Sequence, residues 1–215
     1  MNPKFSIIIP TVKATILVKQ CIDSLIKHEP DRDKYEILVI DDGSDAYVQD
    51  WLKKFANESG VKLHLKDKNQ GFSHTVNIGL RNASGEYLLL VNNDILFIQP
   101  CLDEFEKSFK MDDKIAIIGA KLLYPNHSIQ HAGVVRIPNS HSFVHINKHR
   151  DRHVPEVNQS KYYLAVTGAL FGIRKTFFES AGGLNESYFV ACEDVEYCLR
   201  SWKLGSRVYY NHKIS

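Results

Sequence analysis

Residues 87–94 read YLLLVNND and decide the fold, because a run of large apolar residues ends there on three polar side chains. A run of this kind predicts a strand that is buried on both faces, as in parallel sheets. Such sheets bind their ligands beyond the carboxyl ends of their strands, which is where Asn92, Asn93 and Asp94 fall. A second acidic pair, Glu193 and Asp194, opens a predicted helix much further along the chain. The two clusters predict a metal-nucleotide site and a separate catalytic base.

Apolar runs alternate with amphipathic stretches on both sides of this segment, a pattern typical of helices packed on a mostly parallel sheet. The expected strands are 5–9, 36–40, 61–65, 87–91, 115–118 and 207–210, and the expected helices are 16–26, 48–55, 76–80, 102–109, 175–181 and 194–204. Prolines predict loops and short strands across 122–159, with regular structure returning at 162–171. The last strand would be an edge with no terminal helix to cover it, which predicts a C-terminally incomplete chain.

The length and composition predict one domain over residues 1–215, with one or two lobes. The 215 residues contain 44% hydrophobic side chains, enough for a sizeable core. Because 27 basic and 25 acidic residues are spread along the chain, we expect no polycationic surface for nucleic acid. The four cysteines form no CxxC pair, and the apolar run 5–9 is too short for a signal peptide or a membrane span. We therefore expect reduced thiols and a cytoplasmic protein.

Two polar stretches are candidates for nucleotide contacts. Asp42 follows the second predicted strand, where a carboxylate can accept hydrogen bonds from a base N–H or a ribose hydroxyl. The alternative is turn chemistry alone, since Asp and Gly are favoured after strands. Gly71 permits close backbone approach to a ligand, and the amides of Asn69 and Asn77 can bind ribose or phosphate. A simple turn with a helix cap is the alternative for these three residues.

Asn93 and Asp94 carry oxygen atoms of the kind that Mg²⁺ and Mn²⁺ prefer. One carboxylate can suffice, because substrate phosphates and water complete the coordination shell of Mg²⁺. The alternative is that Asp94 only caps the end of its strand. Glu193 and Asp194 also have an alternative explanation, because the helix dipole favours acidic residues at a helix N-terminus.

Five stretches in this order and spacing resemble the inverting family 2 glycosyltransferases, which have a GT-A fold. They are FSIIIPT (5–11), EILVIDDGSD (36–45), NQGFSHTVNIGLRNASGEYLLLVNND (69–94), IGAKLLYPNHSIQHAG (118–133) and VTGALFGIRKTFFESAGGLNESYFVACEDVEYCLRSWKLGSRVYY (166–210). The resemblance covers nearly the whole chain. It implies a Rossmann-like sheet flanked by helices, with 1–99 as the nucleotide-binding half and 100–215 as the acceptor-side half.

The resemblance also implies roles for individual residues. The donor nucleotide would contact Pro10, Thr11, Asp42, Asn69, Gly71, Asn77, Asn93 and Asp94, with Asp42 on uracil or thymine and Asp94 on Mg²⁺ or Mn²⁺. Asp194 would be the general base, with Glu193 as second choice. Thr167 and Gly168 would line the acceptor side, and Trp202 would either stack on a sugar or fill the core. The chain departs from the family pattern at Asn93 and Asn185, where the family usually has acids.

The implied reaction moves a sugar, with inversion, from a UDP- or dTDP-linked donor to a hydroxyl acceptor during assembly of bacterial surface polysaccharide. The acceptor would be a glycan or a lipid-linked glycan. A lipid-linked acceptor would bring the protein to the inner face of the membrane as a peripheral protein. The alternative that remains open is a catalytically inactive sugar-nucleotide-binding or scaffold module.

Two other protein classes, and a zinc site, fit the sequence less well. A nucleotidyltransferase would have a glycine-rich basic loop after the first strand, where this chain has PTVKAT (10–15). A receiver-type signalling domain would leave the second half unexplained. His141, His145, His149 and His153 recur every four residues, yet no Cys or acidic residue has a usual zinc spacing, so we expect a solvated loop there.

Overall fold

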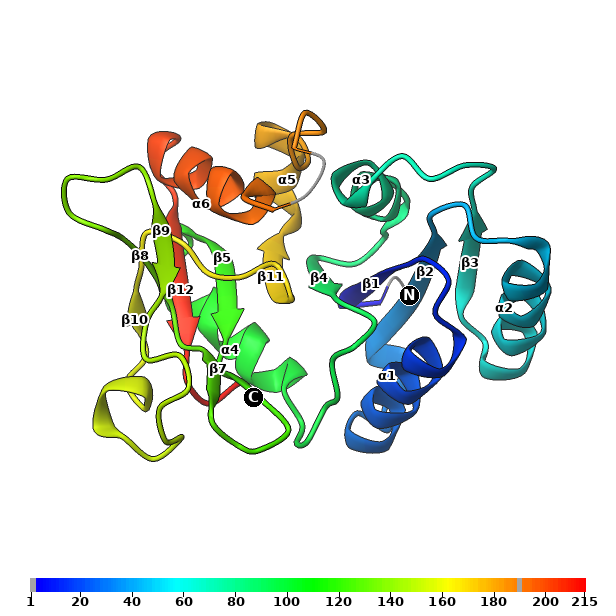
Figure 1. The fold of residues 1–215 in the computed structure, drawn as a ribbon, viewed down its shortest axis with the longest axis horizontal. Helices are drawn as coiled ribbons and strands as arrows, with labels where there is room; N and C mark the ends of the chain where they lie inside the picture. The colour runs from blue at the N-terminus through cyan, green and yellow to red at the C-terminus, as the bar shows by residue number, and fades with distance from the viewer. Residues whose placement is uncertain (1–2, 189–190) are drawn as a thin grey trace.

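The computed structural model describes residues 3–188 and 191–215, and its centre is an eight-stranded mixed sheet (Figure 1). The strand order is β10-β12-β5-β11-β4-β1-β2-β3. β11 runs antiparallel to both β4 and β5, and β10 runs antiparallel to β12, whereas the other neighbours are parallel. The strands are β1 (Phe5–Thr11), β2 (Tyr35–Asp41), β3 (Lys62–Leu65), β4 (Tyr87–Val91), β5 (Ile115–Ala120), β10 (Lys161–Tyr162), β11 (Leu170–Arg174) and β12 (Arg207–Asn211).

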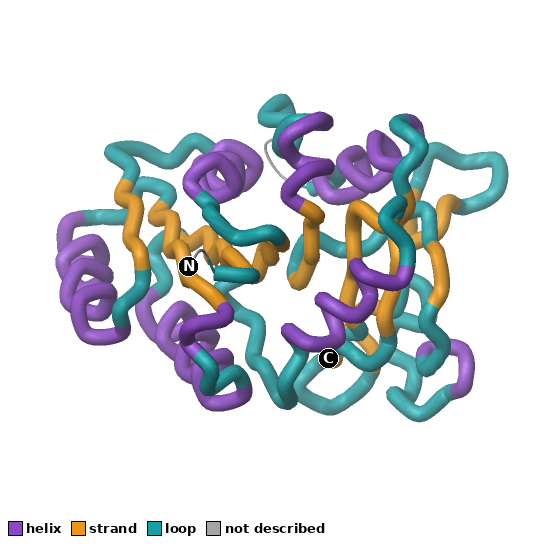
Figure 2. Tube along the Cα trace, turned by 180° about the vertical axis from the view of Figure 1, so that it is seen from behind, coloured by secondary structure: helices purple, strands orange, loops and turns teal. Residues whose placement is uncertain are grey.

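Two layers of helices cover the sheet, because side chains alternate between the faces of each strand. Ile7 and Ile9 of β1 join the core under α1 (Thr15–His28), α2 (Ala46–Ser59) and α4 (Leu102–Met111). Ile8 joins the other core, under α3 (Phe72–Asn82), α5 (Lys175–Ala181) and α6 (Glu193–Lys203). The reverse view shows the strands as one row between the two helical layers (Figure 2). Among the described residues, none of the helices combines the length and apolar character needed to cross a bilayer.

Short strands and loops occupy the region between β5 and β11, as predicted. β6 (Leu122–Leu123) pairs with β7 (Ile129–His131), and β8 (Val134–Arg136) pairs with β9 (Phe143–His145). Single 3₁₀ turns lie at Arg32–Lys34 and Pro155–Val157. The histidines at 141–153 therefore lie on a hairpin and turns and do not form one helical face. Within the described residues, no group of three or more His, Cys, Asp or Glu side chains is placed to bind a metal.

The predicted α/β class and mostly parallel sheet are confirmed, with two corrections. The strand expected at an edge, β12, lies between β10 and β5, because both of its sides are paired. The segment 162–171 is not one regular element, since β10 ends at Tyr162 and β11 begins at Leu170. The stretch between these two strands carries Thr167 and Gly168 to the carboxyl end of β4. All four cysteines are free thiols.

Candidate active site

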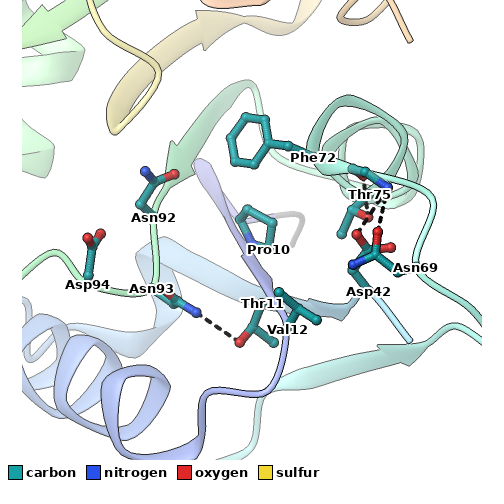
Figure 3. A pocket seen from close by; sticks show the side chains of 11 residues that line it. Pro10, Thr11, Val12, Asp42, Asn69, Phe72, Thr75, Asn92, Asn93 and Asp94 are labelled. Carbon is teal, nitrogen blue, oxygen red and sulfur yellow. Dashed lines mark hydrogen bonds between the residues drawn. The ribbon is translucent and has the colours of Figure 1, made fainter. Parts of the chain in front are cut away.

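A cavity of about 330 Å³ opens at the carboxyl ends of β1, β2 and β4, the place predicted from the sequence (Figure 3). Asp42 and Asp94 lie at opposite ends of this cavity, and Phe72 leans over it (Figure 3). It is lined by Pro10, Thr11, Val12, Asp42, Asn69, Gly71, Phe72, Thr75, Asn92, Asn93 and Asp94. The fold therefore brings together every residue predicted for the donor site except Asn77.

Asp42 is held as a buried carboxylate at the end of β2. Its Oδ1 accepts hydrogen bonds from Lys66 Nζ at 2.5 Å and from the Gln70 N–H at 2.9 Å, and its Oδ2 accepts one from the Gly71 N–H at 3.2 Å. Burial by itself raises the pKa of this carboxyl, but the hydrogen bonds from Lys66 and Gln70 outweigh burial, so the pKa lies below its usual value. Asp42 is therefore ionised at neutral pH and can only accept hydrogen bonds.

Lys66 is a site residue that the sequence analysis missed. It follows β3 directly, and its side chain is 4% exposed. Its ammonium also donates to Thr75 Oγ1, at 2.9 Å, and so joins the β2 end to α3. A single lysine after a strand is typical of a solvent-exposed position, and no signal in the sequence paired this one with Asp42.

The loops at this end of the sheet pack closely on one another. Gly43 has a φ of 72°, and a Cβ built there would lie 2.3 Å from the backbone of Lys68. Gly71 has a φ of 90° and begins the turn into α3. Both positions favour glycine, the first for lack of space and both for their left-handed backbone. The close approach in the structure is therefore between Gly43 and the backbone of Lys68, and the approach of Gly71 to a ligand stays a prediction.

Asn77 lies away from the cavity, although we expected it to contact the donor. Its side chain is buried, with Nδ2 donating to Leu184 O and to Glu186 Oε1 at 2.8 Å each. Its Oδ1 accepts the Leu184 N–H, also at 2.8 Å. Because these three bonds occupy the amide, Asn77 fastens α3 to the turn that follows α5.

Asn92, Asn93 and Asp94 form the other end of the cavity. Asn93 Nδ2 donates to Thr11 Oγ1 at 2.9 Å, which leaves its oxygen as a free acceptor within the described residues. Asn92 Oδ1 is buried with no hydrogen-bond partner among the described residues. The carboxylate of Asp94 is exposed to the cavity. Both residues line the cavity, and an amide oxygen and an open carboxylate are ligand types that a hard divalent cation takes together with phosphate and water.

A second cavity, of about 250 Å³, adjoins the first across Phe72 and Asn92, which line both. It contains Thr167, Gly168, Glu193 and Asp194. The fold thus places the second acidic pair next to the first cluster, although the two are far apart in the sequence.

The carboxylate of Asp194 has a fixed orientation at the start of α6. Its Oδ2 accepts the Gly168 N–H at 2.8 Å, and its Oδ1 accepts the Val195 N–H at 2.7 Å. Burial raises the pKa of Glu193, whose Oε2 is buried without a partner among the described residues. Of the two acids, Asp194 is the one that backbone donors hold toward the cavity.

Trp202 is partly buried against the core and lines neither of the two cavities. Its indole N–H donates to Tyr163 O at 3.0 Å, and its ring lies against the buried cluster beneath α6. The structure therefore supports the core alternative for Trp202, and the sugar-stacking alternative loses its support.

Comparison with known proteins identifies the family. A family model described as Glycosyl transferase family 2 matches residues 6–163. The chain belongs to glycosyl transferase family 2. O-antigen biosynthesis protein RfbC of Myxococcus xanthus is 31% identical to this family member over 96% of the chain and 16% of RfbC. The uncharacterized protein y4gI of Sinorhizobium fredii is 29% identical over 93% of the chain and 22% of y4gI, so the chain spans only a small part of either relative.

Solved structures confirm the GT-A fold of this family 2 member. GalNAc-T7, solved with UDP, GalNAc and Mn²⁺, gives a TM-score of 0.80 and covers 97% of this chain and 41% of its own, at 17% identity. The family model includes the donor-side cavity and ends before Thr167 and Asp194, whereas the match with RfbC extends over 96% of the chain.

Proposed function

We propose that this family 2 chain is the catalytic domain of an inverting glycosyltransferase that uses a UDP- or dTDP-linked sugar. The observation that carries the proposal is the arrangement of three carboxylates around two adjoining cavities. Asp42 and Asp94 lie at the two ends of the first cavity, and Asp194 lies in the second. A nucleoside diphosphate would occupy the first cavity, and its sugar would reach toward the second.

Asp42 supports a donor with a uracil or thymine base. Both bases present an N–H between two carbonyl oxygens, and an ionised carboxylate accepts from that N–H. The Asn69 and Gly71 loop would pack beside the ribose. Pro10 and Thr11, at the end of β1, would form the floor of the site.

Asp94 and the amide oxygens of Asn92 and Asn93 would hold Mg²⁺ or Mn²⁺ at the diphosphate end. When bound, the cation would neutralise the negative charge of the leaving diphosphate. Thr11 would hold the Asn93 amide so that its oxygen faces the cavity, since Asn93 donates through its nitrogen.

Asp194 would act as the general base. Its carboxylate would take the proton of the acceptor hydroxyl while that oxygen attacks the anomeric carbon and the bond from this carbon to the diphosphate oxygen breaks. Attack from the face opposite the leaving group inverts the anomeric centre. A diphosphate leaves without protonation, so one carboxylate is enough, in contrast to the pair used in glycoside hydrolysis. Glu193 is the second choice for this role.

The setting we propose is assembly of a bacterial surface polysaccharide, supported by the name of the RfbC relative. The acceptor would be a glycan or a lipid-linked glycan, the latter met at the inner face of the membrane. Metal assistance is supported by GalNAc-T7, which was solved with UDP and Mn²⁺.

Calorimetric titration of UDP, dTDP, GDP and ADP, with Mn²⁺ and then with EDTA, tests the donor site. We expect metal-dependent binding of one pyrimidine diphosphate, weakened in Asp42→Asn and losing its metal dependence in Asp94→Ala. Asp194→Asn should keep this binding and lose sugar transfer, as measured by release of the nucleoside diphosphate. Folded protein that binds none of the four would refute the proposal, and binding without transfer under any donor and acceptor would favour the inactive module.

A further inference from the structure

Two histidines contact each other next to the Thr167–Gly168 backbone, which binds the Asp194 carboxylate. His131 ends β7 and is fully buried, while His145 ends β9 at an exposed position of the neighbouring hairpin. Their Nδ1 atoms are 3.0 Å apart, and their rings meet edge to face with an interplanar angle of 79°. Neither residue lines the two cavities of the proposed site.

The contacts of His131 define where its proton lies. The Thr167 N–H donates to His131 Nε2 at 3.3 Å, so this nitrogen carries a lone pair. A neutral His131 then holds its proton on Nδ1 and donates it to Nδ1 of His145. Both rings are thus neutral, each in one tautomer, and the order of donors runs from Thr167 through His131 to His145.

Burial favours this neutral state. It lowers the pKa of His131 well below its usual value, and the nearby His145 lowers it further. Although His145 is exposed as a residue, partial burial of its ring lowers its pKa; Lys148 acts in the same direction and Asp194 in the opposite one. The other ring that faces His131 is Tyr210, at 6.4 Å between centroids.

The backbone at 167–168 connects this pair to the carboxylate. The Thr167 N–H is bound to His131, and the next N–H along the chain, that of Gly168, donates to Asp194 Oδ2 at 2.8 Å. A Cβ built at Gly168 would lie 3.2 Å from the Cβ of Asp194, so the backbone approaches this carboxylate closely. Because the two residues are consecutive, the direction of the Gly168 N–H depends on how the Thr167 N–H is anchored.

We propose that His131, braced by His145, is a positioning residue that orients the Asp194 carboxylate through the Thr167–Gly168 backbone. This inference rests on the proposed role of Asp194 as the base. Protonation of His131 would place an N–H against the Thr167 N–H and break the anchor. The residues that contact the nucleotide in the first cavity take no part, so loss of the anchor should lower kcat and leave donor affinity unchanged.

Three variants test the proposal. His131→Leu removes the acceptor for Thr167, whereas His131→Gln offers an amide oxygen that can replace Nε2. His141→Ala is the matched control, because His141 is an exposed histidine of the same region. We expect His131→Leu to lower kcat by about 10- to 100-fold, the usual cost of a small misplacement of a reacting group. The Kd for the nucleoside diphosphate should stay the same, and His131→Gln should recover most of the loss.

Hydrogen exchange provides a readout that needs no activity. The Gly168 amide should exchange roughly tenfold faster in His131→Leu than in the wild type, and at the wild-type rate in His141→Ala. In the wild type, ¹⁵N NMR should show His131 protonated on Nδ1 alone. If the wild type transfers no sugar but Gly168 exchanges faster in His131→Leu, the proposed function is wrong and His131 still anchors the Thr167–Gly168 backbone. Unchanged Gly168 exchange in folded His131→Leu overturns the anchoring.

His145→Ala covers the case in which His131→Leu does not fold. It leaves the buried ring in place and removes only the acceptor of its Nδ1 proton. We then expect a mixture of His131 tautomers and a smaller fall in kcat, again with unchanged nucleotide affinity. A single Nδ1–H tautomer and wild-type kcat in His145→Ala would overturn the bracing role of His145.

Discussion

Replacing Lys66 by Met tests whether Asp42 owes its ionised state to the buried ammonium. Methionine has a similar length and fits an apolar environment, so the change removes the charge and keeps most of the packing. Removing one partner of a buried ion pair costs about 3–5 kcal/mol. Asp42 keeps its backbone donors at Gln70 and Gly71, so we expect the lower end, about 3 kcal/mol at pH 7.

The loss should depend on pH. In the wild type the pKa of Asp42 is lowered, so its contribution to stability is fully present above the unfolded value of about 3.9 and is lost as the pH falls through the folded value. In Lys66→Met the burial of Asp42 remains without its strongest opposing contact, so the folded pKa should rise above the unfolded one. The deficit of the variant should then be largest at pH 7 and shrink as the pH falls toward 4.

Urea unfolding followed by tryptophan fluorescence, at pH 7 and at pH 5, measures both effects. Lys68→Met is the matched control, since Lys68 is an exposed lysine of the same loop, and we expect it to change stability by less than about 0.5 kcal/mol. The reasoning would be refuted if the free energy of unfolding of Lys66→Met were within about 1 kcal/mol of the wild-type value at both pH values. A buried Asp42 carboxylate without its ammonium partner should cost more than that.

Three further substitutions test other parts of the fold. Asn77→Ala leaves the Leu184 N–H and C=O buried without partners and should lower the free energy of unfolding by about 2–3 kcal/mol in urea titrations. The pKa of Glu36 is lowered to about 2, because its hydrogen bonds outweigh its burial. The Glu36→Gln variant should therefore have a lower free energy of unfolding than the wild type at pH 7, and this difference should disappear between pH 4 and pH 2 in an acid titration. Gly119→Ala places a Cβ 2.4 Å from that of the buried Val166 and should lower stability by about 1–3 kcal/mol, seen as a reduced Tm in calorimetry.

The sequence predicted the strands best where both faces are buried. The prediction for β4, 87–91, matches the structure at both ends, and the prediction for β2 is within one residue at either end. Both strands are continuous apolar runs, which is the pattern of strands buried on both faces of a sheet. The position of Asp42 and Asp94 in one cavity could also be predicted, since parallel strand ends meet at one edge of the sheet. Local pattern was sufficient for these features.

Contacts between distant segments could not be predicted in the same way. The pairing of Lys66 with Asp42 depends on the loop after β3 folding back over the end of β2. The place of β12 between β10 and β5 depends on strand order, which burial alone does not encode. Asn77 carries an amide that could bind a ligand. Its face of α3 points to the turn after α5, so the amide forms hydrogen bonds with that turn instead.

Helix α3 connects the two ends of the proposed site mechanically. Its first residues adjoin Gly71, whose N–H binds Asp42, and its middle is fastened by Asn77 to the turn at 182–184. Arg200 of α6 donates to the same turn, at Gly183 O and 2.8 Å, and α6 begins with the acidic pair that contains Asp194. A disturbance near Asp42 can therefore reach Asp194, the proposed base, through helix packing without any ligand contact. For this reason Asn77→Ala, a change outside both cavities, should affect nucleotide affinity and transfer rate together, whereas loss of the histidine anchor should affect the rate alone.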